Sequence, residues 1–243
     1  MFSINNLILF LAALIGGLAV FLFKKENSKN LKLVLSFSGA YLFAITILHL
    51  MPEVYESGNK YTGLFVLLGF SFQIILEQFS EGIEHGHIHT HSHKQELIFP
   101  IGIMLSLCLH AFLEGMPLVN QSIGSNELNS LVFGIAIHHI PAAFALASVL
   151  IRNQVKGSKL VLMLVIFALM TPAGCFVSQQ IQIDSANQIH NYFPFIMATV
   201  IGIFLHISTT ILFESNVDHR FNFYKMIAII IGAGIAVVNF LLH

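Results

Sequence analysis

Apolar residues fall into eight long runs along this chain, and short polar segments separate the runs. Each run is close to the roughly 20 residues that an α-helix needs to cross the hydrocarbon layer of a bilayer. The runs cover roughly residues 5–23, 33–51, 62–80, 97–119, 131–151, 160–180, 193–213 and 226–242. The pattern predicts an all-α polytopic membrane bundle of eight transmembrane helices, which form one transmembrane domain over residues 1–243.

The composition agrees with a protein embedded in lipid. Hydrophobic residues make up 56% of the chain and charged residues 9%, whereas soluble domains have about 45–50% and about 25%. The formal net charge of −1 gives no reason to expect a nucleic-acid partner. The first apolar run has no basic segment before it and no small-residue cleavage site, so we expect a retained helix rather than a signal peptide.

Basic residues lie in alternate connecting segments, and only Lys60 departs from this alternation. The other lysines and arginines are Lys24, Lys25, Lys29, Lys32, Lys94, Arg152, Lys156, Lys159, Arg220 and Lys225. Because Lys and Arg are retained on the cytoplasmic side of membrane proteins, we expect both termini to be extracytoplasmic. From the compact loops we expect a multi-pass protein of a prokaryotic inner (plasma) membrane.

Three histidines and one glutamate lie inside the fourth and fifth apolar runs, where charge is costly unless it is paired: His110, Glu114, His138 and His139. His110 and Glu114 share one helix face, since they are four residues apart. Counted from the short segment that joins the two predicted helices, His110 and His138 lie within roughly one turn of each other in depth. Two imidazoles and a carboxylate suit zinc, and also iron, manganese or cobalt. The sequence therefore predicts a central metal site.

Prolines follow both histidine motifs, at Pro117 and Pro141. Each proline frees a backbone carbonyl one turn earlier, which is typical of helices that line a polar cavity in transporters. The alternative interpretation is a set of structural His–Glu hydrogen bonds between helices.

Other polar groups near the helix ends are candidates for a route to and from this site. His49 and Glu53 close the second helix near the outer surface, and Glu77, Glu81 and Glu84 lie at the inner end of the third helix. The alternative is that they are ordinary helix-end groups in water. His206, in the seventh run, is a further candidate metal ligand or the source of an interhelical hydrogen bond.

A tract of alternating histidines, "EHGHIHTHSHK", lies in the segment of about residues 81–96, which the charge pattern assigns to the cytoplasm. Its histidines are His85, His87, His89, His91 and His93. Such tracts bind metals loosely through several imidazoles. The alternative is a disordered tether with incidental histidines.

With these motifs the chain resembles the ZIP (Zrt/Irt-like) family of divalent-metal transporters over most of its length. The resemblance lies in "HLMPE" closing the second helix, "HAFLEG" in the fourth, "HHIPAAFAL" in the fifth and the His-rich segment. It implies that His110, Glu114 and His138 bind the transported metal. It also implies a 3+2+3 arrangement, in which the first three and last three helices are inverted repeats around the central two.

The chain departs from the family pattern at positions that would build a second, bridged metal site. Ala111 stands where the family often has Asn, Ala142 where it often has Glu, and Thr171 where some members have a carboxylate. His139 compensates only partly, because it lies about 100° round the helix from His138. We therefore expect one central ion, with water or His206 completing its shell.

The sequence favours a transporter that moves a divalent metal toward the cytoplasm, and not an enzyme. Zinc is the expected cargo, with Fe²⁺, Mn²⁺, Co²⁺ and Cd²⁺ as further candidate ions, and the expected partners are these ions and the lipid bilayer. Whether the chain forms a homodimer is left open. The alternatives are an intramembrane zinc-dependent hydrolase that acts on a lipid and a metal sensor without flux. Acidic groups at both helix ends and the histidine tract favour transport.

Overall fold

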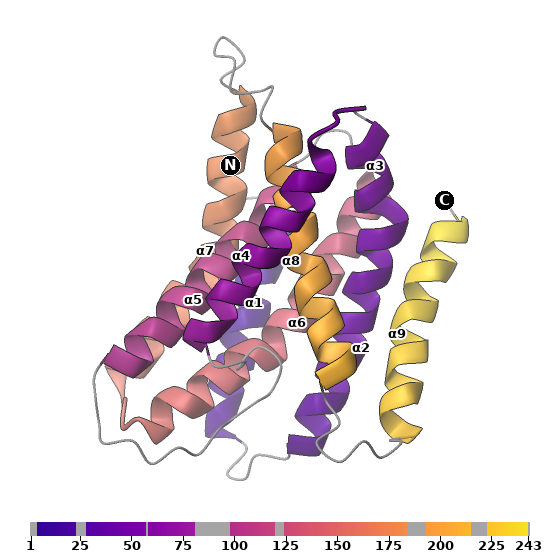
Figure 1. The fold of residues 1–243 in the computed structure, drawn as a ribbon. Coiled ribbons are helices and arrows are strands. Elements are labelled where there is room, and N and C mark those ends of the chain that lie inside the picture. Colours follow the sequence, from indigo (N-terminus) through magenta and orange to yellow (C-terminus); the bar gives the residue numbers. More distant parts are fainter. Residues whose placement is uncertain are drawn as a thin grey trace.

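A computed structural model describes residues 4–22, 28–56, 58–80, 98–119, 124–183, 193–214 and 223–242. In these ranges the chain is a bundle of long helices (Figure 1). Its elements are α1 (Ile4–Leu18), η1 (Ala19–Phe21), α2 (Ser28–Ile45), η2 (Thr46–Leu50), α3 (Met51–Glu56), α4 (Thr62–Ser80), α5 (Ile98–Gly115), η4 (Met116–Val119), α6 (Ser125–Arg152), α7 (Ser158–Ile183), α8 (Phe193–Glu214) and α9 (Phe223–Leu242).

Eight stretches of the described chain are long and apolar enough to cross a membrane, which confirms the predicted eight-helix membrane fold. Two of them exceed the predicted runs the most. The second continues to Glu56, because the chain passes Pro52 through the π-helical turn η2, where the Met51 N–H bonds the Thr46 carbonyl. The fifth begins at Ser125, where polar residues already form the first turn of α6.

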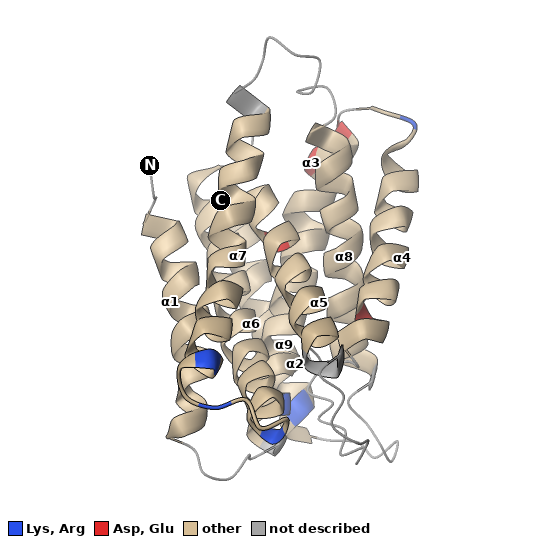
Figure 2. Ribbon diagram, turned by 90° about the vertical axis from the view of Figure 1, so that its left-hand side faces the viewer, with Lys and Arg blue, Asp and Glu red and all other residues tan. Residues whose placement is uncertain are grey.

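Lysine and arginine residues gather at one end of the bundle, and both termini lie at the other (Figure 2). The exception is the segment between α3 and α4, which carries Lys60. We call the end with the termini the outer end. The distribution agrees with the predicted orientation, which stays a prediction. The histidine tract, Glu81 and Glu84 lie outside the described residues.

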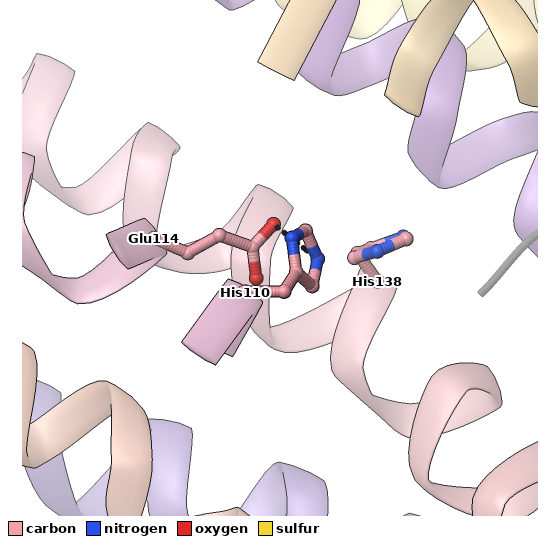
Figure 3. Close-up of side chains that lie close together, drawn as sticks. All are labelled: His110, Glu114 and His138. Atoms are coloured by element: carbon pink, nitrogen blue, oxygen red, sulfur yellow. Dashed lines mark ion pairs between the residues drawn. The ribbon is translucent and has the colours of Figure 1, made fainter. Parts of the chain in front are cut away.

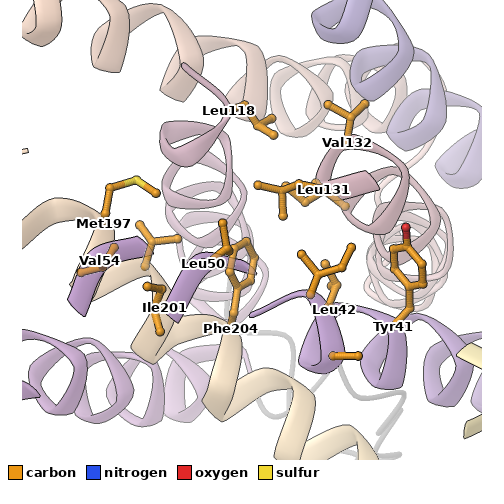
Figure 4. Packing of buried hydrophobic residues seen from close by; sticks show 14 of the residues in the cluster. Tyr41, Leu42, Leu50, Val54, Leu118, Leu131, Val132, Met197, Ile201 and Phe204 are labelled. Atoms are coloured by element: carbon orange, nitrogen blue, oxygen red, sulfur yellow. The ribbon is translucent and has the colours of Figure 1, made fainter. Parts of the chain in front are cut away.

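Buried apolar side chains form two main clusters, and α6 passes from one to the other. The first cluster joins α2, α3, α8 and the outer half of α6, and Figure 4 shows Leu42, Leu131 and Phe204 packed within it. The second joins α5, α7 and the inner half of α6, from Ala143 onward. The polar middle of α6 therefore lies between two apolar layers. The inverted repeat implied by the family resemblance stays a prediction.

Candidate metal centre

His110 and Glu114 form a contact on one face of α5. The His110 Nε2 and Glu114 Oε1 atoms are 3.3 Å apart, as expected for side chains one helical turn apart. α5 ends at Gly115, directly after Glu114, and the chain continues as the tighter η4 turn that contains Pro117. The pair thus lies in the last turn and a half of the helix.

His138 approaches this pair from α6. One ligand atom from each of His110, Glu114 and His138 lies within 4.8 Å of the others. The rings of His110 and His138 are nearly perpendicular, with centroids 6.0 Å apart. Figure 3 shows the three side chains pointing toward one another, with His110 between the other two in this view. The structure brings together the three residues that the depth count selected, and their metal-binding role stays a prediction.

This central cluster is closed off from solvent. His110 is 2% exposed, and Glu114 and His138 are 0% exposed. Among the described residues, no hydrogen bond reaches Glu114 Oε1 or either ring nitrogen of His110, because the 3.3 Å approach of Nε2 to Oε1 lacks hydrogen-bond geometry. A buried polar atom without a partner costs about 1–3 kcal/mol. The cluster therefore offers electron-pair donors that a bound cation would satisfy.

His139 reaches the same carboxylate from the other side. Its Nε2 lies 2.5 Å from Glu114 Oε2, and its Nδ1 lies 3.5 Å from the Thr171 hydroxyl of α7. With the Nε2–H donating to the carboxylate, Nδ1 of the neutral ring accepts from Thr171. The helical offset of His139 from His138 indicated only a partial role, and the contact with Glu114 was not predicted. Glu114 thus faces His110 through Oε1 and His139 through Oε2.

Helix α7 supports this site through hydrogen bonds from its side chains to the backbone where α5 ends. Side chains of α7 donate to carbonyls at the junction of α5 and η4, from Cys175 Sγ to the Gly115 carbonyl (3.1 Å) and from Ser178 Oγ to the Met116 carbonyl (2.9 Å). Helix ends leave such carbonyls without intrahelical partners. The polar side chains of α7 therefore stabilise the point at which α5 tightens beside Glu114.

His206 does not belong to the central cluster of the described residues. Its Nε2 lies 2.6 Å from Glu77 Oε2 of α4, and its ring packs edge-on against Phe70. Glu77, which was predicted to line the inner end, is therefore the partner of His206. The expected role of His206 as a fourth ligand stays a prediction that this contact does not favour.

His49 meets a partner other than Glu53 in the structure. Its Nδ1 lies 3.3 Å from Glu127 Oε1, in the first turn of α6. The role of His49 and Glu53 in metal binding stays a prediction. Glu127 was not among the predicted site residues, because an acidic residue in the first turn of a helix is ordinary.

Comparison with known proteins adds a family assignment to this geometry. A family model described as ZIP zinc transporter matches residues 4–98 and 84–239. Protein zntD of Dictyostelium discoideum is 27% identical over 171 residues, which are 65% of this chain and 25% of that protein. Zinc transporter ZIP1 of Danio rerio is 31% identical over 94 residues, which are 39% of this chain and 30% of that protein. The matched parts thus span less than a third of either relative. Because the family match extends from α1 into α9, the chain belongs to the ZIP zinc transporter family.

Proposed function

We propose that this chain transports divalent metal cations across a membrane, with zinc as cargo, through the cluster of His110, Glu114 and His138. The observation that carries the proposal is this buried cluster within a member of the ZIP zinc transporter family. Imidazole and carboxylate ligands are those that zinc prefers when thiolates are absent. One of the similar relatives is named a zinc transporter, which is in keeping with this cargo.

The ligand set also suits a cargo that must leave again. Three protein ligands leave a coordination position for water, whereas a closed four-ligand shell is typical of structural zinc. A single carboxylate balances only part of the charge of a divalent ion. We infer moderate affinity, which allows both loading and release.

Burial of the cluster implies that transport needs a change of conformation. With the three side chains at most 2% exposed, an ion cannot reach them from either end without movement of the helices. We infer that the site opens alternately to the two ends, as in carriers that bind cargo at the bilayer middle. The proposed direction is toward the lysine-rich end, which we assign to the cytoplasm.

Metal uptake into empty liposomes tests the proposal. Purified protein with a zinc-sensitive dye inside the vesicles should give zinc flux, and His110→Ala, Glu114→Ala or His138→Ala should nearly abolish it. Ser148→Ala is a matched control, because Ser148 is a buried polar residue of α6 outside the cluster. Normal flux through Glu114→Ala would remove α5 from the site.

The same assay separates the alternatives. An intramembrane hydrolase or a metal sensor should bind zinc and give no flux. The family assignment does not favour the hydrolase. Parallel measurements with Fe²⁺, Mn²⁺, Co²⁺ and Cd²⁺ would establish the selectivity.

A further inference from the structure

A second pair of metal-ligating side chains lies at the outer end of the bundle. The Nδ1 atom of His49, in η2, is 3.3 Å from Oε1 of Glu127, in the first turn of α6. The side chain of His49 is 7% exposed and that of Glu127 is 40% exposed. The pair therefore joins a shielded imidazole to a carboxylate that water and ions can reach.

The second ring nitrogen of His49 is an independent observation. Nε2 is buried and has no hydrogen-bond partner among the described residues. Edge-on packing against Phe240 of α9, with ring centroids 5.2 Å apart, holds the imidazole in place. A histidine that only anchored η2 to α6 would leave this nitrogen unsatisfied at a cost of about 1–3 kcal/mol. The arrangement is better suited to a ligand.

The local backbone is also unusual at this point. His49 lies in a five-residue π-helical segment, Thr46–Leu50, between two α-helical segments. π-helical turns are rare and frequently occur at functional sites. The wider turn changes the direction of His49 relative to a regular helix. His49 therefore meets Glu127 from a locally widened turn.

Helix α6 connects this outer pair to the central cluster. Glu127 precedes His138 by eleven residues, which is about three turns and about 16 Å along the helix. Eleven residues at about 100° each bring Glu127 to within about 20° of the direction of His138. One face of α6 therefore carries the carboxylate of the outer pair and the imidazole of the central cluster.

A neutral oxygen donor lies one turn further inward on the same side. Asn239 of α9 donates through Nδ2 to Ser130 Oγ, at 2.8 Å, and Ser130 follows Glu127 by one turn of α6. The Oδ1 atom of Asn239 is buried and has no hydrogen-bond partner among the described residues. Inward from Glu127, the Oδ1 atom of Asn239 is therefore a further oxygen that can coordinate a cation.

We propose that His49 and Glu127 form an outer site that captures a divalent cation before it moves to the central cluster. The proposal rests on the proposed transport function. Two protein ligands, one of them partly exposed, bind more weakly than the three buried ligands of the centre. The outer site therefore raises the local concentration of cargo and passes the ion inward.

Cadmium binding to the full chain in lipid nanodiscs tests the site without measuring flux. The background protein carries two sets of substitutions. Glu114→Ala removes the central carboxylate, and replacement of the five tract histidines by serine removes loose metal binding in that segment. Equilibrium dialysis should then find one weakly bound Cd²⁺ per chain. His49→Phe, which keeps an aromatic ring against Phe240, and Glu127→Gln should each remove it.

Glu56→Gln is the matched control, because Glu56 is an exposed carboxylate at the outer end of α3. This variant should keep the weak site. A background protein that binds no Cd²⁺ would overturn the proposal, and so would binding that survives both His49→Phe and Glu127→Gln. Either result would leave the central site and the transport proposal in place.

Zinc uptake by the otherwise unchanged protein adds a kinetic readout. His49→Phe and Glu127→Gln should raise the zinc concentration for half-maximal uptake on the order of tenfold, since even groups behind metal ligands contribute about 10- to 100-fold to affinity. The maximal rate should be retained. A lower maximal rate and a lower melting temperature, with unchanged half-saturation, would identify the contact as a structural link and overturn the proposal.

Discussion

Glu114 holds the only carboxylate of the central cluster, and its two oxygens face different imidazoles. Oε1 lies 3.3 Å from His110, and Oε2 lies 2.5 Å from His139. The hydrogen bond from His139 fixes the rotation of the carboxylate, so that Oε1 points toward His110 and His138. A metal ion in the cluster would therefore meet one oxygen of Glu114 in a fixed position.

Replacement of His139 tests this positioning role. His139→Leu leaves Glu114 Oε2 buried without its donor, and we expect a loss of about 1–3 kcal/mol in the free energy of unfolding. Metal binding should weaken as well, because the carboxylate is free to rotate. His139→Gln supplies an N–H donor of similar reach and should recover part of both losses. Thermal unfolding and zinc titration of the two variants would check this, and identical behaviour would contradict it.

Competition between protons and metal provides a second test at this scale. Imidazole binds a metal only after it loses its proton, so metal affinity depends on pH when histidines are ligands. Zinc affinity should be highest near pH 8 and should fall as the pH is lowered through about 6.5, the usual pKa of histidine in peptides. Zinc titrations of a variant in which serine replaces the five tract histidines would report binding at the central cluster. A constant affinity between pH 5 and pH 8 would exclude imidazole ligation.

At the scale of the element, α5 and α7 touch backbone to backbone beside the central cluster. A Cβ atom at Gly174 would lie 1.9 Å from the Phe112 carbonyl oxygen, and one at Gly115 would lie 2.1 Å from the Thr171 carbonyl oxygen. Only glycine permits this approach, which brings Thr171 to His139. The two glycines are thus part of the construction of the site, although neither offers a ligand atom.

Gly174→Ala should therefore separate α5 from α7. Backbone atoms cannot rotate away as side chains do, so we expect a loss of about 1–3 kcal/mol, as is typical of overpacked interiors, together with weaker metal binding. Gly234→Ala is the matched control, since a Cβ atom there meets nothing within 4 Å. It should leave melting temperature and zinc affinity unchanged or raise stability slightly. Equal melting temperatures for the two variants would contradict the close contact.

For the whole molecule, the number of acidic groups in the interior sets the number of ions that it can hold. Two divalent cations a few ångströms apart repel strongly in a medium of low dielectric constant, and paired sites use bridging carboxylates to offset this. Glu114 is the only acidic member of the cluster among the described residues. The nearby positions Ala111, Ala142 and Thr171 are buried and carry no charge.

We therefore expect one central metal ion per chain. Crystals soaked in zinc or cadmium should give one strong anomalous peak among His110, Glu114 and His138. The second oxygen of Glu114 is occupied by His139, which adds to the argument against a bridged pair. Two strong peaks about 4 Å apart, the usual spacing of paired metals, would contradict this prediction.

Local pattern alone determined the features that repeat along a single helix. Eight apolar runs predicted eight spans, because the hydrophobic length of a helix does not depend on its neighbours. The i, i+4 spacing placed His110 beside Glu114 for the same reason. Counting residues from a short loop located His138 at the depth of His110, since the rise per residue of a helix is constant.

Contacts between helices were decided only by the tertiary structure. Glu114 with His139, Glu77 with His206 and His49 with Glu127 each join residues of different helices. Such pairs depend on the rotation and tilt of each helix, and these follow from close packing at positions such as Gly174 rather than from apolar periodicity. The sequence therefore indicated which polar residues come together at one depth, whereas packing selected the partner that each one meets.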